Sequence, residues 1–347
     1  MAKNKALERL LVSIRIRSAT LKTQPLLGGL VPRLRVMGTF TKPVSFLFIA
    51  VVISSVLSPH FLTWDNIMAV LVASSPLMII AIGEALVVLT GMIDLGTESV
   101  LASSGMLLAL LDLYTSLPTY VSVLLTLIYG AAVGLANGVL VTKAKIPSFI
   151  STLGMYWGLR GIGMVISNGW PLGPSSVSPP KQFTFTGIAG RFFGFPLMVA
   201  ISLVMVVVFQ VFVSEFKKGR EIYAVGGNEV AAKNCGVNVD RTKLFVFVVS
   251  GTLGAVSGII MTAWLNQGYA WTAQGYSLEA IAAVVLGGIP FTGGTGTIAG
   301  VAVGSFIISM LADVIVLIGI SPLYNYIVVA IVLVLAGLQL QRRYVSK

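Results

Sequence analysis

The stretch Gly219–Asp240 reads GREIYAVGGNEVAAKNCGVNVD and is a polar segment rich in small residues. It lies between two long apolar runs, at 195–214 and 244–265. A chain that crosses a bilayer repeatedly can keep such a segment either as a connecting loop or as a docking element for a soluble partner. These two interpretations imply different functions, and the sequence on either side of the segment is needed to distinguish them.

The composition places the chain among polytopic membrane proteins. Of its 347 residues, 56% are hydrophobic and 10% are charged, and the mean hydropathy is +0.95. An ordinary soluble domain contains about 25% charged residues. The formal net charge of +11 comes from basic residues at the edges of apolar runs, so it does not indicate binding to nucleic acid. We therefore expect an all-α polytopic membrane protein.

Apolar runs along the sequence predict about ten transmembrane helices, some of them short or interrupted by glycine. The runs are 44–58, 67–90, 96–112, 119–141, 147–167, 195–214, 243–265, 277–290, 296–318 and 322–340. Residues 146–149 resemble 320–323, and 94–105 resemble 273–288; both pairs lie five spans apart, as in an inverted 5+5 repeat. A third pair of similar segments, 87–91 and 284–288, lies six spans apart, which would give a repeat without inversion. An inverted and a non-inverted repeat therefore both stay open.

The placement of lysine and arginine orients the predicted spans. Basic residues cluster before the first span, at Lys143 and Lys145, between 217 and 243, and after the last span. With an even number of spans, all these regions fall on the cytoplasmic side. The chain then divides into a basic cytoplasmic tail (1–42), a transmembrane domain (43–341) with a cytoplasmic loop at 215–241, and a cytoplasmic C-terminal tail (342–347). Leucine spacing within 6–17 also fits an amphipathic helix on the membrane surface.

Polar side chains within the predicted spans are candidates for a translocation pathway. A charge in lipid is costly and usually faces a cavity or a partner. Glu84 lies deep in its span, Asp94 lies where residues 91–96 interrupt an apolar run, and Glu279 begins a short half-span. The candidates are Glu84, Asp94, Glu98, Asn137 and Glu279. Structural pairing or capping is the alternative role for each acid, because a proton relay would need a continuous series of carboxylates.

No pattern in the sequence predicts a catalytic residue, a metal site or a cofactor. The chain has one histidine, His60, and one cysteine, Cys235. A serine triad needs a histidine near its nucleophile, and a zinc site needs several cysteine or histidine ligands. The glycine-rich stretch at 293–300, GGTGTIAG, matches neither the phosphate-loop pattern nor GxGxxG. Energy for transport would therefore come from another subunit or from an ion gradient.

Three blocks of the sequence resemble the sugar-type permease subunits of ABC importers, the ribose/xylose/galactose/autoinducer-2 group. The blocks are 87–105, 219–251 and 276–304. The first departs from the family pattern, because Thr97 and Glu98 stand where the family usually has Val and Gly. The resemblance implies a subunit of the cell (inner) membrane that imports a sugar or a similar small polar solute. It also implies three partners: a second permease subunit, an ATPase that holds ATP and Mg, and an external solute-binding protein.

The resemblance gives the loop after the sixth span the role of coupling helices that fit a groove on the ATPase. Small residues there offer a low-profile surface, Asn228 suits a helix cap, and Tyr223 suits an interface anchor. The coupling candidates are Tyr223, Gly226, Gly227, Asn228, Glu229, Ala231, Ala232 and Gly236. A bulky residue in place of Gly227 is expected to uncouple ATP hydrolysis from transport.

The residues alone leave two other classes of function open. An ion-coupled secondary transporter would work without an ATPase and would use Glu84 and Asp94. A membrane enzyme would need a catalytic cluster, and the absence of such a pattern from the sequence counts against it.

Overall fold

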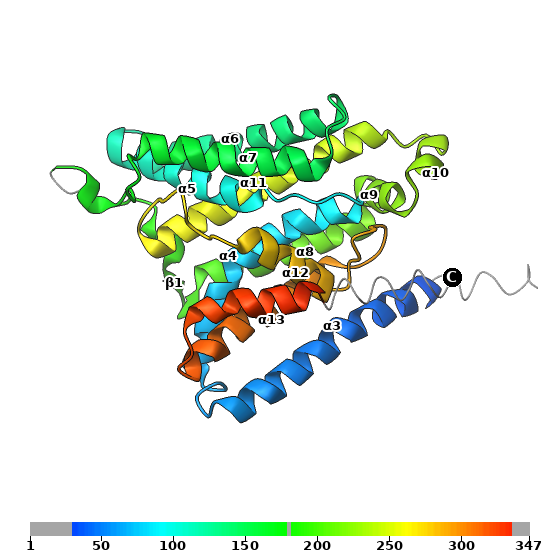
Figure 1. Cartoon of the computed structure of the whole chain (residues 1–347), viewed down its shortest axis with the longest axis horizontal. Helices are drawn as coiled ribbons and strands as arrows, with labels where there is room; N and C mark the ends of the chain where they lie inside the picture. Colours follow the sequence, from blue (N-terminus) through cyan, green and yellow to red (C-terminus); the bar gives the residue numbers. More distant parts are fainter. Residues whose placement is uncertain (1–29, 179–181, 335–347) are drawn as a thin grey trace, which may run out of the picture.

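The computed structural model describes the backbone of residues 30–178 and 182–334, and the side chains of these residues from position 43 onward. The helix considered at 6–17 and the tail at 342–347 lie outside the described residues. Within them the protein is all-α, apart from one short hairpin (Figure 1). In that hairpin, strand β1 (Arg191–Phe192) pairs antiparallel with strand β2 (Phe195–Pro196).

The helices follow the predicted apolar runs closely. In chain order they are α3 (Leu30–Leu57), α4 (Trp64–Leu89), α5 (Thr97–Tyr114), α6 (Thr119–Thr142), α7 (Ser148–Ile166), α8 (Leu197–Glu215), α9 (Lys217–Gly227), α10 (Glu229–Asn234), α11 (Val239–Leu265), α12 (Tyr276–Leu286) and α13 (Ile298–Leu317). Short 3-10 turns occur at η1 (Pro174–Ser176), η2 (Thr186–Ala189) and η3 (Pro322–Tyr324). A last apolar helix covers Pro322–Val334.

Helix α3 extends upstream of the first predicted apolar run. The helix begins at Leu30 and continues to Leu57, so residues 30–42 are helical and run without a break into the first apolar run. Hydropathy detects only the apolar part of a helix, and the more polar first turns of α3 lie upstream of that part.

Six of the described helices are long and apolar enough to cross a membrane: α4, α6, α7, α8, α11 and α13. The apolar segments Pro43–Leu57, Tyr276–Leu286 and Pro322–Val334 are shorter. Helix α12 is short because two glycines follow it directly. Gly288 has φ +91, a left-handed conformation that glycine adopts without strain and that ends a helix.

Helices α4 and α11 form the centre of the molecule, and the other long helices surround them. In their most apolar windows, 83% of α4 and 67% of α11 is buried, against 22% of α8 and 28% of α7. Glycines let α11 approach α6, since a Cβ at Gly130 would lie 2.5 Å from the Cβ of Ala255. The glycines of α6 and α11 thus allow these two helices to pack closely. At Gly154 and Gly158 of α7, by contrast, a Cβ would meet nothing within 4 Å among the described residues.

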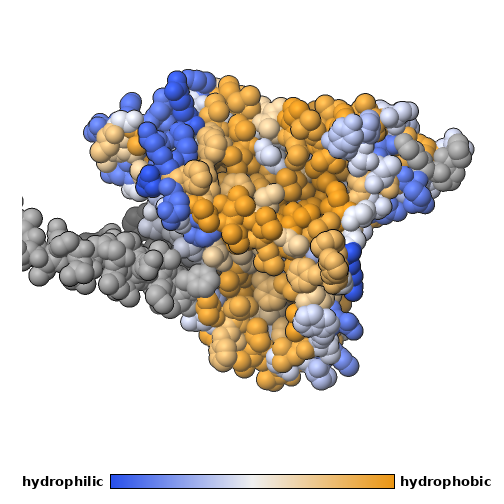
Figure 2. Space-filling view, turned by 180° about the vertical axis from the view of Figure 1, so that it is seen from behind, coloured by the Kyte–Doolittle hydropathy of each residue, from blue (hydrophilic) through white to orange (hydrophobic). Residues whose placement is uncertain are grey.

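The surface has an apolar middle and hydrophilic ends. Figure 2 shows hydrophobic residues across the centre of the molecule, with hydrophilic residues gathered toward the two sides. Helices α9 and α10 lie at one of these ends, and β1 lies at the other (Figure 1). Lys145 of the α6–α7 loop forms an ion pair with Asp240 of α11 (Nζ–Oδ1 3.2 Å), so this loop and the start of α11 share the α9–α10 end.

Candidate functional site

The first group of predicted residues lies at the break between α4 and α5. Helix α4 ends at Leu89, α5 begins at Thr97, and residues 90–96 between them are irregular, with Gly91 at φ +77. An irregular segment in a membrane domain has backbone N–H and C=O groups without helical partners, so side chains must bond them. Thr152 and Ser148 of α7 accept from the N–H groups of Leu95 (3.0 Å) and Ile93 (3.3 Å).

Two predicted acids meet at this break. Glu84 is fully buried, and its Oε1 accepts from the backbone N–H of Asp94 at 3.1 Å. Asp94 is 4% exposed; its Oδ1 accepts from the N–H of Gly96 (2.8 Å) and its Oδ2 from the hydroxyl of Ser250 (3.1 Å). Glu84 Oε2 has no hydrogen-bond partner within the described part of the chain. The two carboxylates are thus held in fixed positions at the point where the central helix is interrupted.

Asn137 lies beside the same break. It is 2% exposed on α6, and its Oδ1 accepts from the hydroxyl of Ser151 at 3.2 Å. A Cβ at Gly96 would lie 3.6 Å from Asn137 Nδ2, which places this amide next to the backbone of the break. Three of the five pathway candidates, Glu84, Asp94 and Asn137, are therefore neighbours.

Glu98 belongs to a neighbouring cluster, built around a buried ion pair and joined to the break by the hydroxyl of Ser277, which donates to the carbonyl oxygen of Leu95 at 3.0 Å. Its Oε1 lies 2.5 Å from Nη2 of Arg160 on α7, and the two side chains are 3% and 2% exposed. The backbone N–H of Ser277 donates to Glu98 Oε2 (2.8 Å), while the N–H of Glu98 donates to the hydroxyl of Ser277 (3.2 Å). Glu98 and Ser277 stand in the first turns of α5 and α12, so each side chain bonds a free N–H at the start of the other helix.

Aromatic rings and a carbonyl group complete the surroundings of Arg160. Its guanidinium lies over the rings of Tyr156 (4.9 Å) and Trp271 (4.8 Å), and its Nη1 donates to the carbonyl oxygen of Ala270. A carboxylate, a carbonyl and two ring faces thus compensate one buried cation. Arg160 links α5, α7 and the segment between α11 and α12.

Glu279 stands two residues after Ser277 and interacts electrostatically with Glu98. Its Oε1 accepts from Nδ2 of Asn325 in the last described helix, at 2.8 Å. Each of these acids thus accepts a hydrogen bond from a partner of its own, which fits the structural pairing or capping considered as the alternative role.

The coupling candidates lie on α9, α10 and the turn that follows. Asn228 accepts from the N–H of Ala231 (2.9 Å) and caps α10, as the sequence predicts. Gly227, Asn228, Glu229, Ala231 and Gly236 are exposed, whereas Ala232 is buried. Glu229 forms an ion pair with Lys243 of α11 at 2.7 Å, which fixes α10 against the start of that helix.

Two coupling candidates face the interior of the protein instead. Tyr223 is partly buried, its hydroxyl donates to the carbonyl oxygen of Gly296 at 2.8 Å, and burial raises its pKa to about 12. Gly226 lies against Leu89 and Gly294, whereas Gly227 has open space around it. On the same helix, the hydrogen bond from Lys218 (2.6 Å) lowers the pKa of Glu221.

The comparisons with known proteins identify the family. Residues 66–337 match the family model described as branched-chain amino acid transport system / permease component. The chain belongs to this permease family. Ribose import permease protein RbsC of Escherichia coli K12 is 38% identical over 297 residues, covering 86% of this chain and 92% of that protein. RbsC of Bacillus subtilis is 36% identical over 296 residues (85% and 91%), and the L-arabinose transport system permease protein AraH of Escherichia coli K12 is 34% identical over 291 residues (84% and 86%). No solved structure matches the chain.

Membership assigns the protein its general role. It is a multi-pass inner-membrane permease subunit of an ABC importer rather than an enzyme, and ATP hydrolysis belongs to a separate subunit. The resemblance of the three sequence blocks to ABC permeases is confirmed.

Arg160 is the residue of the permease that sequence reasoning did not assign to the site. It is the one lysine or arginine between 146 and 180, inside a predicted span, and this isolation was the available signal. Its partner lies 62 residues away in the chain, so spacing alone could not identify the pair.

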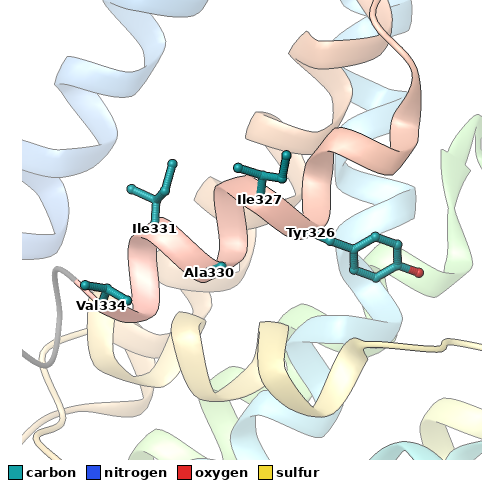
Figure 3. A pocket seen from close by; sticks show the side chains of 5 residues that line it. All are labelled: Tyr326, Ile327, Ala330, Ile331 and Val334. Atoms are coloured by element: carbon teal, nitrogen blue, oxygen red, sulfur yellow. The ribbon is translucent and has the colours of Figure 1, made fainter.

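A pocket of the permease begins one residue after Asn325, the partner of Glu279. It has a volume of about 450 Å³ and lies along the last described helix, where Figure 3 shows its lining. The lining residues are Tyr326, Ile327, Ala330, Ile331 and Val334. These side chains are almost entirely apolar, as is typical of a helix surface that contacts lipid or another apolar helix.

Proposed function

We propose that this permease subunit imports a pentose or a similar small polar solute, driven by an ATPase that docks on α9 and α10. The three named relatives are permeases for ribose or for L-arabinose, which are both pentoses. The relatives are covered over most of their length, so the likeness is not confined to one shared segment.

The proposed topology has ten membrane crossings, with both chain termini in the cytoplasm. The basic side chains at the α9–α10 end support this orientation, because cytoplasmic loops are rich in lysine and arginine. They are Lys143, Lys145, Lys217, Lys218, Arg220, Lys233, Arg241 and Lys243. Pro147 caps the start of α7, and Pro322 is the first residue of the 3-10 turn that opens the last helix, which suits the inverted repeat.

In this topology the tail at 1–42 and the tail at 342–347 are cytoplasmic, and residues 43–341 form the transmembrane domain. The opposite end of the molecule, which carries β1 and β2, then faces outward, toward a solute-binding protein. A second permease subunit completes the assembly. The break at residues 90–96, with Glu84, Asp94 and Asn137 beside it, is the proposed position of the translocation pathway, because irregular backbone in a membrane domain suits a cavity wall.

One observation carries the docking proposal: α9 and α10 present a low surface of small residues at the charged end of the molecule. Gly227, Ala231 and Gly236 are exposed, and α10 is held in place by its Asn228 cap and by the Glu229–Lys243 pair. Small exposed residues let a partner backbone approach closely, and a helix that is already held in place loses little entropy on binding.

The docking proposal is tested by a single bulky charge on the exposed face. A Cβ at Gly227 would meet nothing within 4 Å among the described residues, so we expect Gly227→Arg to give a folded permease that no longer co-purifies with the ATPase. Gly187→Arg is the matched control, because Gly187 also has open space around it and lies in η2, between α7 and β1. Normal co-purification of the Gly227→Arg variant would refute docking at this surface.

A further inference from the structure

The inner side of α9 is in backbone contact with the end of the central helix. A Cβ at Gly226 would overlap the carbonyl oxygen of Leu89 and would lie 2.7 Å from the backbone nitrogen of Gly294. Leu89 is the last residue of α4. Helix α9 therefore rests on the main chain of α4, with no side chain in between.

A third backbone segment meets the other two at the same point. The N–H of Gly294 donates to the carbonyl oxygen of Leu89 at 2.9 Å, which bonds a carbonyl that has no helical partner. A Cβ at Gly293 would lie 2.6 Å from that oxygen and 2.7 Å from the nitrogen of Gly91. Gly293 and Gly294 both have φ +73, so glycine is required by conformation as well as by space.

Tyr223 adds a second attachment between α9 and the 293–296 segment. Its hydroxyl donates to the carbonyl oxygen of Gly296 at 2.8 Å. Ile222 and Val225, on the same side of α9, are 0% and 2% exposed. Ile222 packs in the core together with Val88 and Leu89 at the end of α4. The inner side of α9 is thus fixed by hydrogen bonding, by apolar packing and by direct backbone contact.

We propose that these contacts form a junction that transmits movement of α9 to the break between α4 and α5. The junction consists of Tyr223, Gly226, Gly293 and Gly294 against Leu89. Touching backbones cannot give way as flexible side chains can, so α9 cannot shift without displacing Leu89 or the 293–296 segment. Leu89 leads directly into residues 90–96, and this segment holds Asp94 against Glu84.

The inference rests on the proposed function, because it takes α9 to be the element that the ATPase moves. It divides the coupling segment into two sides. Gly227, Asn228 and Ala231 face outward to the partner, whereas Tyr223 and Gly226 are positioning residues that act through Leu89. The two sides can be told apart by experiment. A substitution on the outward-facing side should abolish docking of the ATPase. A substitution on the inward-facing side should leave docking intact but lower the amount of solute imported per ATP hydrolysed.

The test uses the permease assembled with its ATPase and its solute-binding protein in vesicles, where ATP hydrolysis and ribose uptake are both measured. Tyr223→Phe removes only the hydroxyl that bonds Gly296. We expect normal co-purification with the ATPase and about fivefold more ATP hydrolysed per solute imported, the order of effect of one hydrogen bond. Tyr120→Phe, at an exposed ring on α6, is the matched control and should keep the wild-type ratio.

Gly226→Ala is a stronger variant, because its Cβ must displace Leu89 or Gly294. It should raise the amount of ATP hydrolysed per solute imported above the value for Tyr223→Phe. If Tyr223→Phe keeps the wild-type ratio, the proposed junction is refuted. Loss of the ATPase from the Tyr223→Phe preparation would overturn it as well, since Tyr223 would then be a docking residue. Failure of the unaltered permease to co-purify with the ATPase would refute the proposed function instead.

Discussion

At the scale of single residues, Glu98 and Arg160 form the most buried ion pair of the described chain. Their side chains are 3% and 2% exposed, whereas Lys145 and Asp240 are 69% and 44% exposed. A buried pair must recover a large desolvation cost through close geometry and further hydrogen bonds. Glu98 meets that condition, because its second oxygen accepts from the N–H of Ser277 at the start of α12.

Removal of one partner should therefore destabilise the permease strongly. Glu98→Gln leaves the Arg160 cation without its carboxylate, and we expect a loss of about 3–5 kcal/mol in the free energy of unfolding. Thermal unfolding of the detergent-solubilised protein measures this loss. The double variant Glu98→Gln/Arg160→Met removes both charges and should recover part of it.

An exposed pair serves as the control for this measurement. Glu229→Gln breaks the ion pair with Lys243, in which the Glu229 side chain is 55% exposed. This change should lower the free energy of unfolding by less than about 1 kcal/mol. Equal losses in Glu98→Gln and Glu229→Gln would contradict the role assigned to the buried pair.

Sequence reasoning located the polar residues inside the membrane but not their partners. Glu84 and Asp94 were candidates because charge in an apolar run is rare, and the structure brings them together at the break. The pairing of Glu98 with Arg160 depends on how α5 packs against α7, which local sequence does not encode. The inward direction of Tyr223 was missed for the same reason, since only the packing of α9 decides which of its sides is buried.

At the scale of elements, α10 shows how a very short helix is held. It has six residues, too few for independent stability in water. Its support comes from the Asn228 cap, from the buried Ala232 and from the Glu229–Lys243 pair. The cap is the part that the sequence revealed directly, because asparagine before a glutamate is a common helix start.

Asn228→Ala should loosen α10 without unfolding the membrane domain. Loss of an N-cap costs about 1 kcal/mol, so we expect amide hydrogen exchange across 229–235 to accelerate about fivefold. Asn238→Ala removes the equivalent cap of α11, a helix of 27 residues, and should change exchange only near residue 241. Unchanged exchange in α10 of the Asn228→Ala variant would show that tertiary packing alone holds this helix.

The existence of the apolar helices followed from the sequence more reliably than their ends. Each predicted apolar run overlaps a described helix, and residues 335–340 of the last run lie outside the described part of the chain. Burial in an apolar medium requires helical hydrogen bonding. The start of α3 at Leu30 was missed, since its first turns are less apolar than the run that follows. The short α12 was expected, because Gly287 and Gly288 stand directly after it.

At the scale of the whole molecule, the protein has one end rich in basic residues, an apolar middle, and a second end with a small hairpin. The fold class followed from composition alone, because a chain with 10% charged residues has too few to cover a soluble surface of this size. Composition does not show which helices form the centre. That order depends on glycine contacts such as the one between α6 and α11.

The energy source is the central claim about the whole molecule, and uptake by reconstituted vesicles tests it most directly. Permease vesicles receive the ATPase inside and the solute-binding protein outside, and uptake of labelled ribose is followed with ATP, without ATP, and with a proton or sodium gradient alone. We predict uptake only when ATP, the ATPase and the binding protein are all present. Uptake by the permease alone, driven by an ion gradient, would contradict the assignment and would identify an ion-coupled transporter.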